Sequence, residues 1–303
     1  MFRRLTLCLL LCAPTLWLCA QNAFDVTAEA WRCLERQQPD SAVALAQQAV
    51  QLFETNFGKD HPQVGVGYKN LAEISSQAGH TQDAIRHCLK AMDIEREAFG
   101  EDDDAYAELM LALARYYGDD RQYQKSIEWG ERALAYYEDA FPQHLRDLGA
   151  AQSNLTWAYA DAGDYTRAIS MCKQAEQTWI EELGEGHAYI AILQNNLADY
   201  YARLGDFKQA VHYDQRCLDV ISLYTSTPDT LYATALSNMA SHYAAAGQNT
   251  QAIETGQKAV LLRRQLLGEH DPHYLKSVGD LAATYARINE LNEAIRIQEY
   301  VLS

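Results

Sequence analysis

Residues 196–217 read NLADYYARLGDFKQAVHYDQRC, and this stretch decides the fold because its residue types return along the chain at a constant interval. Leu197 and Tyr201 lie four residues apart, so a helix places both on one face, where they are expected in the core. Gly205 then supplies the left-handed residue that ends this helix. Ala210 is small enough for a second helix to pack closely against the first. The stretch therefore predicts a hairpin of two helices.

The interval between equivalent positions is 42 residues, and it is kept over five steps without an insertion. The cores of the first helices are Asn70-Leu71-Ala72, Ala112-Leu113-Ala114, Asn154-Leu155-Thr156, Asn196-Leu197-Ala198, Asn238-Met239-Ala240 and Asp280-Leu281-Ala282. The aromatic column continues through Tyr117, Tyr159, Tyr201, Tyr243 and Tyr285, and the turn column through Gly79, Gly163, Gly205 and Gly247, with Arg121 and Asn289 as exceptions. The two small columns of the second helices run through Ala84, Ser126, Ala168, Ala210, Ala252 and Ala294, and through Ala49, Ala91, Ala133, Ala175, Cys217 and Ala259. Since no useful alternating strand pattern occurs, the sequence predicts an all-α protein, a right-handed superhelical solenoid of tandem helix-turn-helix repeats.

The column order Leu–Ala–Tyr–Gly–Ala–Ala resembles the tetratricopeptide repeat (TPR). The 42-residue period and junctions such as Leu267-Gly268-Glu269-His270-Asp271-Pro272 are similar to the kinesin-light-chain variety of this repeat. The resemblance covers residues 61–303 as tandem repeats, of which the last is truncated. Residues 21–60 form a degenerate first repeat, which keeps Ala42 and Ala49 in register.

Neither composition nor motifs indicate catalysis, and we expect a non-enzymatic protein. The chain has 303 residues and a net charge of −16, which argues against nucleic acid because phosphate binding needs a basic surface. There is no HExxH, CxxC or nucleophile-elbow motif, so no catalytic residue, metal or cofactor is predicted. His61, His187 and His270 recur at the repeat junctions, where Asp60-His61-Pro62 and Asp271-Pro272 place a cap before a proline that can start a helix.

The N-terminus has the composition of a secretory signal peptide. Arg3 and Arg4 precede an apolar run over residues 5–18, and a small residue, Ala20, offers a cleavage point. The run is too short for a stable membrane span. A lipid anchor at Cys19 is disfavoured because the bulky Leu18 stands where a lipobox needs a small residue. We therefore predict residues 1–20 as a signal peptide and an exported bacterial protein, periplasmic or extracellular.

Four cysteines remain beyond that segment, and they are well separated in the sequence. They are Cys33, Cys88, Cys172 and Cys217. None forms a CxxC pair, so small buried thiols on helix faces are expected in preference to a disulfide framework.

An asparagine directly before the core leucine is the best candidate for a binding residue. In repeats of the kinesin-light-chain variety this column resembles asparagines that bond the backbone of an extended peptide in the concave groove, a task for which an amide can donate and accept at once. The same column could instead cap or bridge adjacent helices, and Trp157 could be local packing. The predicted groove residues are Asn70, Asn154, Asn196 and Asn238, with Arg115, Trp157, Asn195, Asp199 and Arg203 supplying selectivity.

These features favour a protein-interaction scaffold that binds a peptide or protein segment. An alternative is the sensory or regulatory half of a longer bacterial signalling or protease protein, truncated at Ser303. A third possibility is a homo-oligomer in which the truncated C-terminal repeat of one copy is covered by another.

Overall fold

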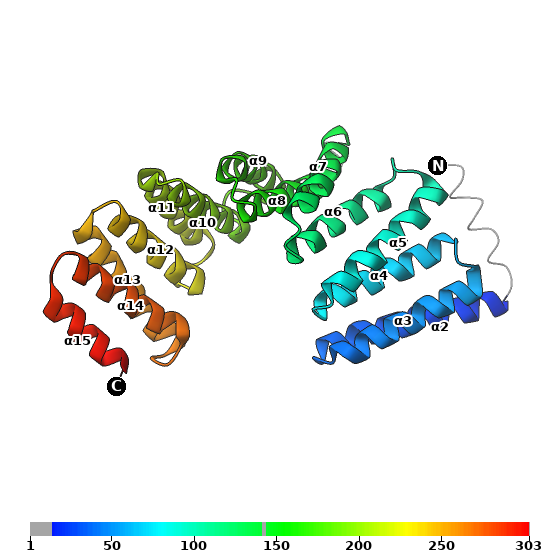
Figure 1. Cartoon of the computed structure of the whole chain (residues 1–303), viewed down its shortest axis with the longest axis horizontal. Helices are drawn as coiled ribbons and strands as arrows, with labels where there is room; N and C mark the ends of the chain where they lie inside the picture. The colour runs from blue at the N-terminus through cyan, green and yellow to red at the C-terminus, as the bar shows by residue number, and fades with distance from the viewer. Residues whose placement is uncertain (1–13, 141–143, 303) are drawn as a thin grey trace. The chain divides into compact units, whose positions relative to one another are not determined.

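The computed structural model describes residues 14–140 and 144–302, and within them every regular element is an α-helix (Figure 1). Two compact units divide the chain after Phe141. Unit 1 holds α2 (Pro14–Glu35), α3 (Pro39–Phe57), α4 (Pro62–Gln77), α5 (Thr81–Phe99), α6 (Asp104–Asp119) and α7 (Tyr123–Asp139). Unit 2 holds α8 (Leu145–Asp161), α9 (Tyr165–Leu183), α10 (Ala188–Arg203), α11 (Phe207–Tyr224), α12 (Thr230–Ala245), α13 (Asn249–Leu267), α14 (Pro272–Arg287) and α15 (Leu291–Leu302).

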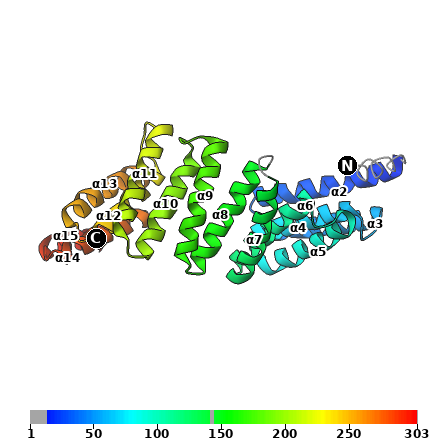
Figure 2. The same ribbon diagram turned by 90° about the horizontal axis from the view of Figure 1, so that it is seen from above.

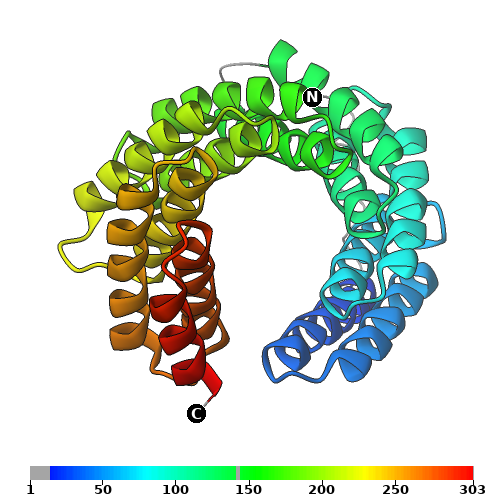
Figure 3. The same ribbon diagram turned by 60° about the vertical axis from the view of Figure 1, so that its left-hand side comes forward.

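The helices pack as consecutive hairpins, each made of a first and a second helix. Within unit 1 the hairpins are α2–α3, α4–α5 and α6–α7, and within unit 2 they are α8–α9, α10–α11, α12–α13 and α14–α15. The second helix of one hairpin packs on the first helix of the next, for example α5 on α6 and α11 on α12. Figures 2 and 3 show the hairpins of each unit side by side, with first and second helices in two layers. The all-α architecture of tandem helical hairpins predicted from the sequence is confirmed.

The small columns occupy the tightest contacts of these hairpins. Ala84, Ala168 and Ala210 are completely buried where a second helix meets its first helix. The core leucines are buried as well, with Leu113 and Leu197 fully inaccessible. A longer side chain in these columns would separate the two helices or force strained rotamers.

The aromatic column differs in depth from the prediction. Tyr117 and Tyr159 are buried, but Tyr201 is only half-buried, as are Tyr243 and Tyr285. Tyrosines one position earlier, Tyr116 and Tyr200, are buried at equivalent positions. The reason is that residues three and four positions beyond the core leucine share one flank of the helix, and the residue three positions on faces the neighbouring helix more directly.

The turn column adopts the left-handed backbone that the sequence predicted. Gly205 has a φ of 80°, and it is followed by a bond from Asp206 N to Tyr201 O of 2.9 Å that closes the end of α10. Arg121 and Asn289 hold the same conformation with φ of 60° and 65°. The Cβ atom of Arg121 carries a steric cost there that glycine avoids.

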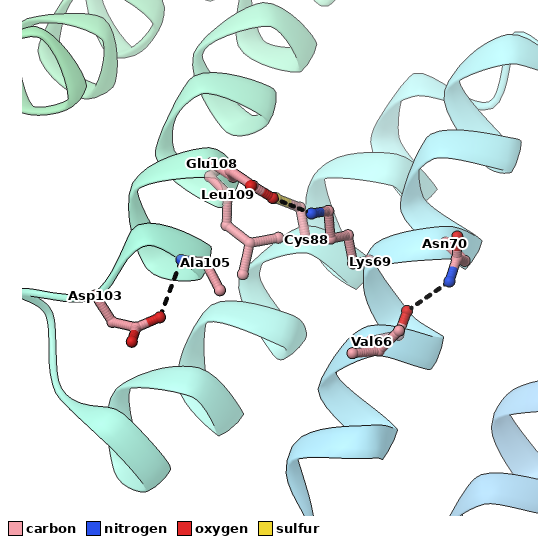
Figure 4. Close-up of polar contacts among 8 residues, drawn as sticks. All are labelled: Val66, Lys69, Asn70, Cys88, Asp103, Ala105, Glu108 and Leu109. Carbon is pink, nitrogen blue, oxygen red and sulfur yellow. Dashed lines mark hydrogen bonds and ion pairs between the residues drawn. The ribbon is translucent and has the colours of Figure 1, made fainter. Parts of the chain in front are cut away.

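The first helices α4, α6, α10, α12 and α14 begin at capped junctions with the same 42-residue period, whereas the N-cap residue of α8, His144, makes no capping bond through its side chain. His61 Nδ1 accepts from Gln63 N at 3.1 Å, and Asp271 accepts from His273 N at 2.8 Å, in both cases beside a proline that starts the helix. Asp103 caps α6 in the same way through Ala105 N, at 3.0 Å (Figure 4). The capping residue at the last junction is Asp271 and not the neighbouring His270, since it is the aspartate that lies in the column.

Helix α2 runs without interruption from Pro14 to Glu35, through the predicted cleavage point after Ala20. Ala23 and Ala30 of this helix are fully buried. Residues 1–13 of the predicted signal peptide lie outside the described residues. A short apolar run is compatible with a signal sequence and with the start of a helix, so residues 14–20 could not be assigned from periodicity alone.

The cysteines of the repeats are free and buried, as predicted. Burial raises the pKa of Cys88, Cys172 and Cys217 to about 12, so these thiols stay protonated and unreactive at neutral pH. Cys88 Sγ donates to Leu109 O at 3.5 Å. The equivalent thiol two repeats later, Cys172, makes the equivalent contact with Leu193 O at 3.6 Å.

The strained turn predicts a stabilising substitution. Arg121→Gly should raise the free energy of unfolding by about 0.5–1 kcal/mol, because glycine removes the Cβ clash at positive φ. The larger conformational entropy of glycine in the unfolded chain offsets part of this gain. Gly163→Arg, at the equivalent turn of the next repeat with a φ of 81°, should lower it by about 1 kcal/mol. Urea titration followed by circular dichroism measures both. A loss of stability in Arg121→Gly would contradict the steric argument.

Candidate functional site

The surface formed by the first helices is the candidate site. In unit 1 α2 contacts α4, and in unit 2 α12 contacts both α10 and α14. Second helices of successive hairpins make no comparable contact within the described residues. The first helices therefore lie on the inner side of each curved stack, which is the concave side in helical repeat proteins.

In unit 1 this first-helix surface is crossed by ion pairs. Glu73 of α4 accepts from Arg115 and from Tyr116 Oη of α6, the latter at 2.8 Å. Burial alone would raise the pKa of Glu73, but its hydrogen bonds and the Arg115 charge outweigh burial and hold the pKa below its ordinary value. Lys69 pairs with Glu108 between the same two helices (Figure 4). The guanidinium of Arg115, which was predicted as a selectivity residue, is thus already paired with a carboxylate of the same chain.

Asn70 of unit 1 turns back to its own helix. Its Nδ2 donates to Val66 O at 3.0 Å, one turn earlier on α4 (Figure 4). The side chain is half-buried. This contact matches the bridging or capping alternative for the asparagine column more closely than a free binding group.

In unit 2 the asparagines divide into two pairs. Asn238 Nδ2 of α12 donates to Asn195 Oδ1 of α10 at 2.9 Å, so these two amides join neighbouring first helices. Asn154 and Asn196 are half-buried, and within the described residues their side chains make no hydrogen bond. Their donors and acceptors remain available on the first-helix surface of unit 2.

Apolar and charged neighbours lie on the same first helices. Trp157 of α8 is 44% exposed, which is more than a packing residue needs. Ile192 of α10 is 38% exposed, and sequence reasoning missed it because its column carries Ala150 and Thr234 in the adjacent repeats. Asp199 and Arg203 pair with each other one turn apart at 3.4 Å.

Helix α12 adds a surface without formal charge. It contains no Asp, Glu, Lys or Arg, and its polar side chains are hydroxyls, amides and His242. Ser237 Oγ lies 2.9 Å from Ser277 Oγ of α14, which links these first helices through hydroxyls. The first helices α4 and α6 of unit 1 are thus joined by ion pairs, whereas α10, α12 and α14 of unit 2 are joined by an amide pair and by hydroxyls.

A buried ionisable pair lies beneath this surface. Asp214 of α11 is fully buried, and its Oδ2 lies 2.7 Å from Nδ1 of His242 on α12. Burial raises the pKa of Asp214, and the contact with His242 opposes that rise. The repeat columns could have revealed both residues, since Cys88 and Cys172 occupy the position of Asp214 and Tyr116 and Tyr200 that of His242.

Two further buried polar groups of unit 2 depart from apolar columns. Glu176 of α9 accepts from Gln194 of α10, and from Arg216 of α11 at 2.9 Å. Arg263 of α13 donates to His273 O at 3.0 Å and also to a serine and a threonine of the first helices α14 and α12. Glu176 thus has a charged and an uncharged hydrogen-bond partner, and Arg263 has uncharged oxygen partners. These hydrogen bonds lower the cost of burying the two groups.

The described residues offer little to inorganic or membrane chemistry. Over residues 14–140 and 144–302, no three His, Cys, Asp or Glu side chains are arranged to hold a metal ion. None of the helices in these ranges has the length and apolar content needed to cross a membrane.

Comparison with known families agrees with the repeat pattern. The sequence signature of the tetratricopeptide repeat matches residues 68–139, 147–221 and 231–302, and a second signature of the same repeat matches 32–63. The chain belongs to the tetratricopeptide repeat family. Members of this family are in general non-enzymatic scaffolds for protein interactions.

The chain is similar to fungal proteins named clustered mitochondria protein homologs. It is 26% identical over 150 residues to the one from Emericella nidulans and 25% identical to the one from Aspergillus niger. The matched part covers 50% of this chain and 12% of either relative, so the chain spans a small part of their length. The prediction of an exported protein, periplasmic or extracellular, is wrong, because these relatives carry a mitochondrial name and α2 continues through the predicted cleavage point. The predicted bacterial origin finds no support in these relatives, which are fungal.

Solved structures show the same fold. A chain from Podosopora anserina, described as kinesin light chain nearly identical TPR-like repeats, has a TM-score of 0.61 at 20% identity and covers 69% of this chain and 99% of its own. BtubC (BKLC) from P. vanneervenii has a TM-score of 0.62 at 20% identity and covers 86% and 95%. A signal transduction ATPase from Pyrococcus horikoshii with a tetratricopeptide repeat sensor has a TM-score of 0.71 at 14% identity and covers 93% and 42%. The resemblance to the kinesin-light-chain variety of the repeat is confirmed.

The buried pair predicts a pH-dependent loss of stability. His242→Ala should lower the free energy of unfolding by about 3 kcal/mol at neutral pH, because Asp214 is left as a buried charge without its partner. Burial raises the pKa of Asp214, so the carboxyl becomes neutral as the pH falls and the destabilisation should shrink. Urea titrations between about pH 4 and about pH 8 measure this slope.

The control for that prediction is the double variant Asp214→Asn/His242→Ala, which lacks the charge. Its free energy of unfolding should be higher than that of His242→Ala at neutral pH. The pH-dependent contribution of Asp214 should be absent from it. If His242→Ala showed the same destabilisation at both ends of the pH range, the loss would come from a packing cavity and the charge argument would fail.

Proposed function

We propose that the protein is an interaction scaffold whose first-helix surface in unit 2 binds an extended segment of a partner protein. The observation that carries this proposal is the pair of uncommitted amides, Asn154 and Asn196, at equivalent positions of neighbouring hairpins. An amide can donate to a peptide carbonyl and accept from a peptide N–H, which suits recognition of a backbone in any sequence. A third amide, Asn238, is held in place by Asn195 and keeps its carbonyl oxygen available.

Side-chain selectivity would come from the apolar groups on the same surface. Trp157 and Ile192 are exposed on adjacent first helices, and exposed aromatic side chains are common anchors in interfaces. The lack of formal charge on α12 disfavours a strongly acidic or basic segment, because nothing on that helix would neutralise it. The proposed ligand segment is therefore extended, with apolar side chains and little net charge.

Unit 1 takes a smaller part in this proposal. Asn70 donates to its own helix, and Arg115 is paired with Glu73. A ligand would have to break these contacts before it could use either group. The ion pairs of unit 1 are better suited to fixing the spacing of α4 and α6.

A second candidate function is a sensory or regulatory module of a longer protein. The matched part of the fungal relatives is 12% of their length, so in those proteins the repeats accompany other sequence. In the Pyrococcus horikoshii protein the repeat is described as a sensor. Such a module would use the same binding surface. Regulation of a protease or signalling domain remains a prediction, and so does self-association through the last repeat.

The groove assignment is tested by removing three amides at once. Asn154→Ala/Asn196→Ala/Asn238→Ala should lose the partners that the wild-type chain captures in affinity purification followed by quantitative mass spectrometry, because backbone bonds are lost at three adjacent hairpins. Circular dichroism should be unchanged, since these side chains are only half-buried.

The matched control removes three exposed amides from second helices, in the variant Gln124→Ala/Gln174→Ala/Gln177→Ala. It should retain the same partners. Capture that is equal in both triple variants would rule out the asparagines as the binding groups. A separate variant, Trp157→Ala, should weaken capture without abolishing it, because the backbone bonds would remain.

A further inference from the structure

A small pocket opens between the first helices α12 and α14, with α13 beneath it. This α12–α14 pocket has a volume of about 20 Å³, which is enough for one water-sized group. Gly256 of α13 and Thr284 of α14 line it. The preceding repeat carries Asp214 and His242 at these two positions, and there the two side chains are buried against each other. The smaller residues therefore leave open, in this repeat, space that a buried pair occupies in the one before.

Oxygen is the polar atom of this lining. Of the nine lining residues, five carry an oxygen in the side chain and none carries a nitrogen there. The other four are alanines, a glycine and a leucine. The oxygen-bearing residues are Ser237, Ser241, Ser277, Asp280 and Thr284.

Hydroxyl hydrogens of the lining are already used within the protein. Ser241 Oγ donates to Ser237 O at 3.1 Å, and Thr284 Oγ1 donates to Asp280 O at 3.0 Å. A hydroxyl has one hydrogen and two lone pairs, so the oxygens of Ser241 and Thr284 can offer only lone pairs to a ligand. The pocket is thus prepared to accept hydrogen bonds and not to donate them.

The carboxylate of Asp280 is the only charged group among the nine lining residues. Asp280 is exposed, and within the described residues its side chain makes no ion pair or hydrogen bond. It stands in the asparagine column, at the position that Asn196 and Asn238 occupy on α10 and α12. A charge therefore replaces an amide at the end of the row that the proposed function uses.

One buried cation lies near this pocket without lining it. Arg263 of α13 donates to Ser277 and to two further oxygens of the first helices. Burial lowers the pKa of Arg263, and the charges of Asp280 and Asp271 oppose that change. Asp280 acts on Arg263 without an ion-pair contact between them in the described structure, so its oxygens remain available to another donor.

We propose that the α12–α14 pocket binds one ammonium group of the extended segment, with Asp280 as its counter-charge. The inference rests on the proposed function, since it names the group that the segment presents where it reaches α14. An ammonium has three N–H donors and no acceptor, which matches a carboxylate and the lone pairs of Ser241 and Thr284. Its single nitrogen suits the volume of the pocket, whereas a planar guanidinium is larger. The ammonium comes from a lysine side chain or from a free N-terminus.

The test begins with a phage-displayed library of random peptides of about 12 residues, which are long enough in extended form to cross the first helices of unit 2. Peptides selected on the full wild-type chain should be enriched in lysine at one position. Selection on Asp280→Asn should lose this enrichment, because asparagine keeps the shape of the side chain and removes its charge. The matched control is Asp219→Asn, the same change at an exposed residue of α11 outside the pocket, and it should keep the enrichment.

Synthetic forms of one selected peptide separate the two sources of the ammonium. Fluorescence anisotropy compares the peptide with a form acetylated at its lysine and a form acetylated at its N-terminus. Loss of the bound ammonium should weaken the affinity for the wild-type chain by about tenfold and leave the affinity for Asp280→Asn nearly unchanged. The acetylation that has this effect identifies the source. Replacing a bound lysine by arginine should also weaken binding to the wild type.

The triple asparagine variant separates failure of this inference from failure of the proposed function. Peptides that need Asn154, Asn196 and Asn238 but show no preference for an ammonium group would overturn the Asp280 site alone. The same conclusion follows if Asp280→Asn keeps that preference. If no selected peptide depends on the three asparagines, the proposed function fails and this inference fails with it.

Discussion

The close approach of two helices at the small columns is the constraint on which the rest of the structure depends. Ala91, Ala133 and Ala175 are completely buried between helices, with no room for another methylene group. A larger residue would move a second helix outward, and within each unit every later hairpin packs on the one before it. The spacing of the first helices, and with it the register of side chains across them, follows from these contacts.

This constraint leaves the remaining positions free to differ between repeats. The column two residues beyond the core leucine holds Glu73 and Arg115 in unit 1, where they pair across first helices, and Trp157 in unit 2. The outward column of the second helices changes from Asp93 to Leu261 in the same manner. Such differences are departures within a fixed frame, and they leave the hairpin contacts that support the surface unchanged.

The fold was predictable because its information is repeated in the sequence. Asn289 was read as a left-handed turn residue from its place in the glycine column, whereas Arg121, which has the same positive φ, was treated as an exception to that column. The sequence was misinterpreted where one residue pattern is compatible with two structures. An apolar run at the N-terminus resembled a signal sequence, although residues 14–20 belong to α2. The aromatic column was placed too deep because positions three and four beyond the leucine differ by a rotation that spacing alone cannot rank.

The contacts of the candidate site were less predictable than its location. Asn70 donates a hydrogen bond to the backbone of its own helix, whereas Asn238 donates to Asn195 of a neighbouring helix. This difference depends on distances between helices, which the identity of the residues in one column does not give. Arg115 was predicted as a groove residue, and its ion pair with Glu73 becomes visible only when α4 and α6 are placed.

The buried charges provide an independent argument for unit 2. Asp214 and His242 occupy columns that uncharged residues fill elsewhere in this chain, among them Cys88, Gly130 and Cys172 in one column and Tyr116, Ala158 and Tyr200 in the other, so the fold does not require them. A buried pair of ionisable side chains seldom stabilises a protein more than apolar residues of the same size would. The pair joins α11 to α12, the helix that carries Asn238 and Ser237, and it fixes the rotation of that helix relative to its neighbour. A scaffold that only needed stability would have kept the apolar column, whereas one that must present amides in register gains from a directional contact beneath them.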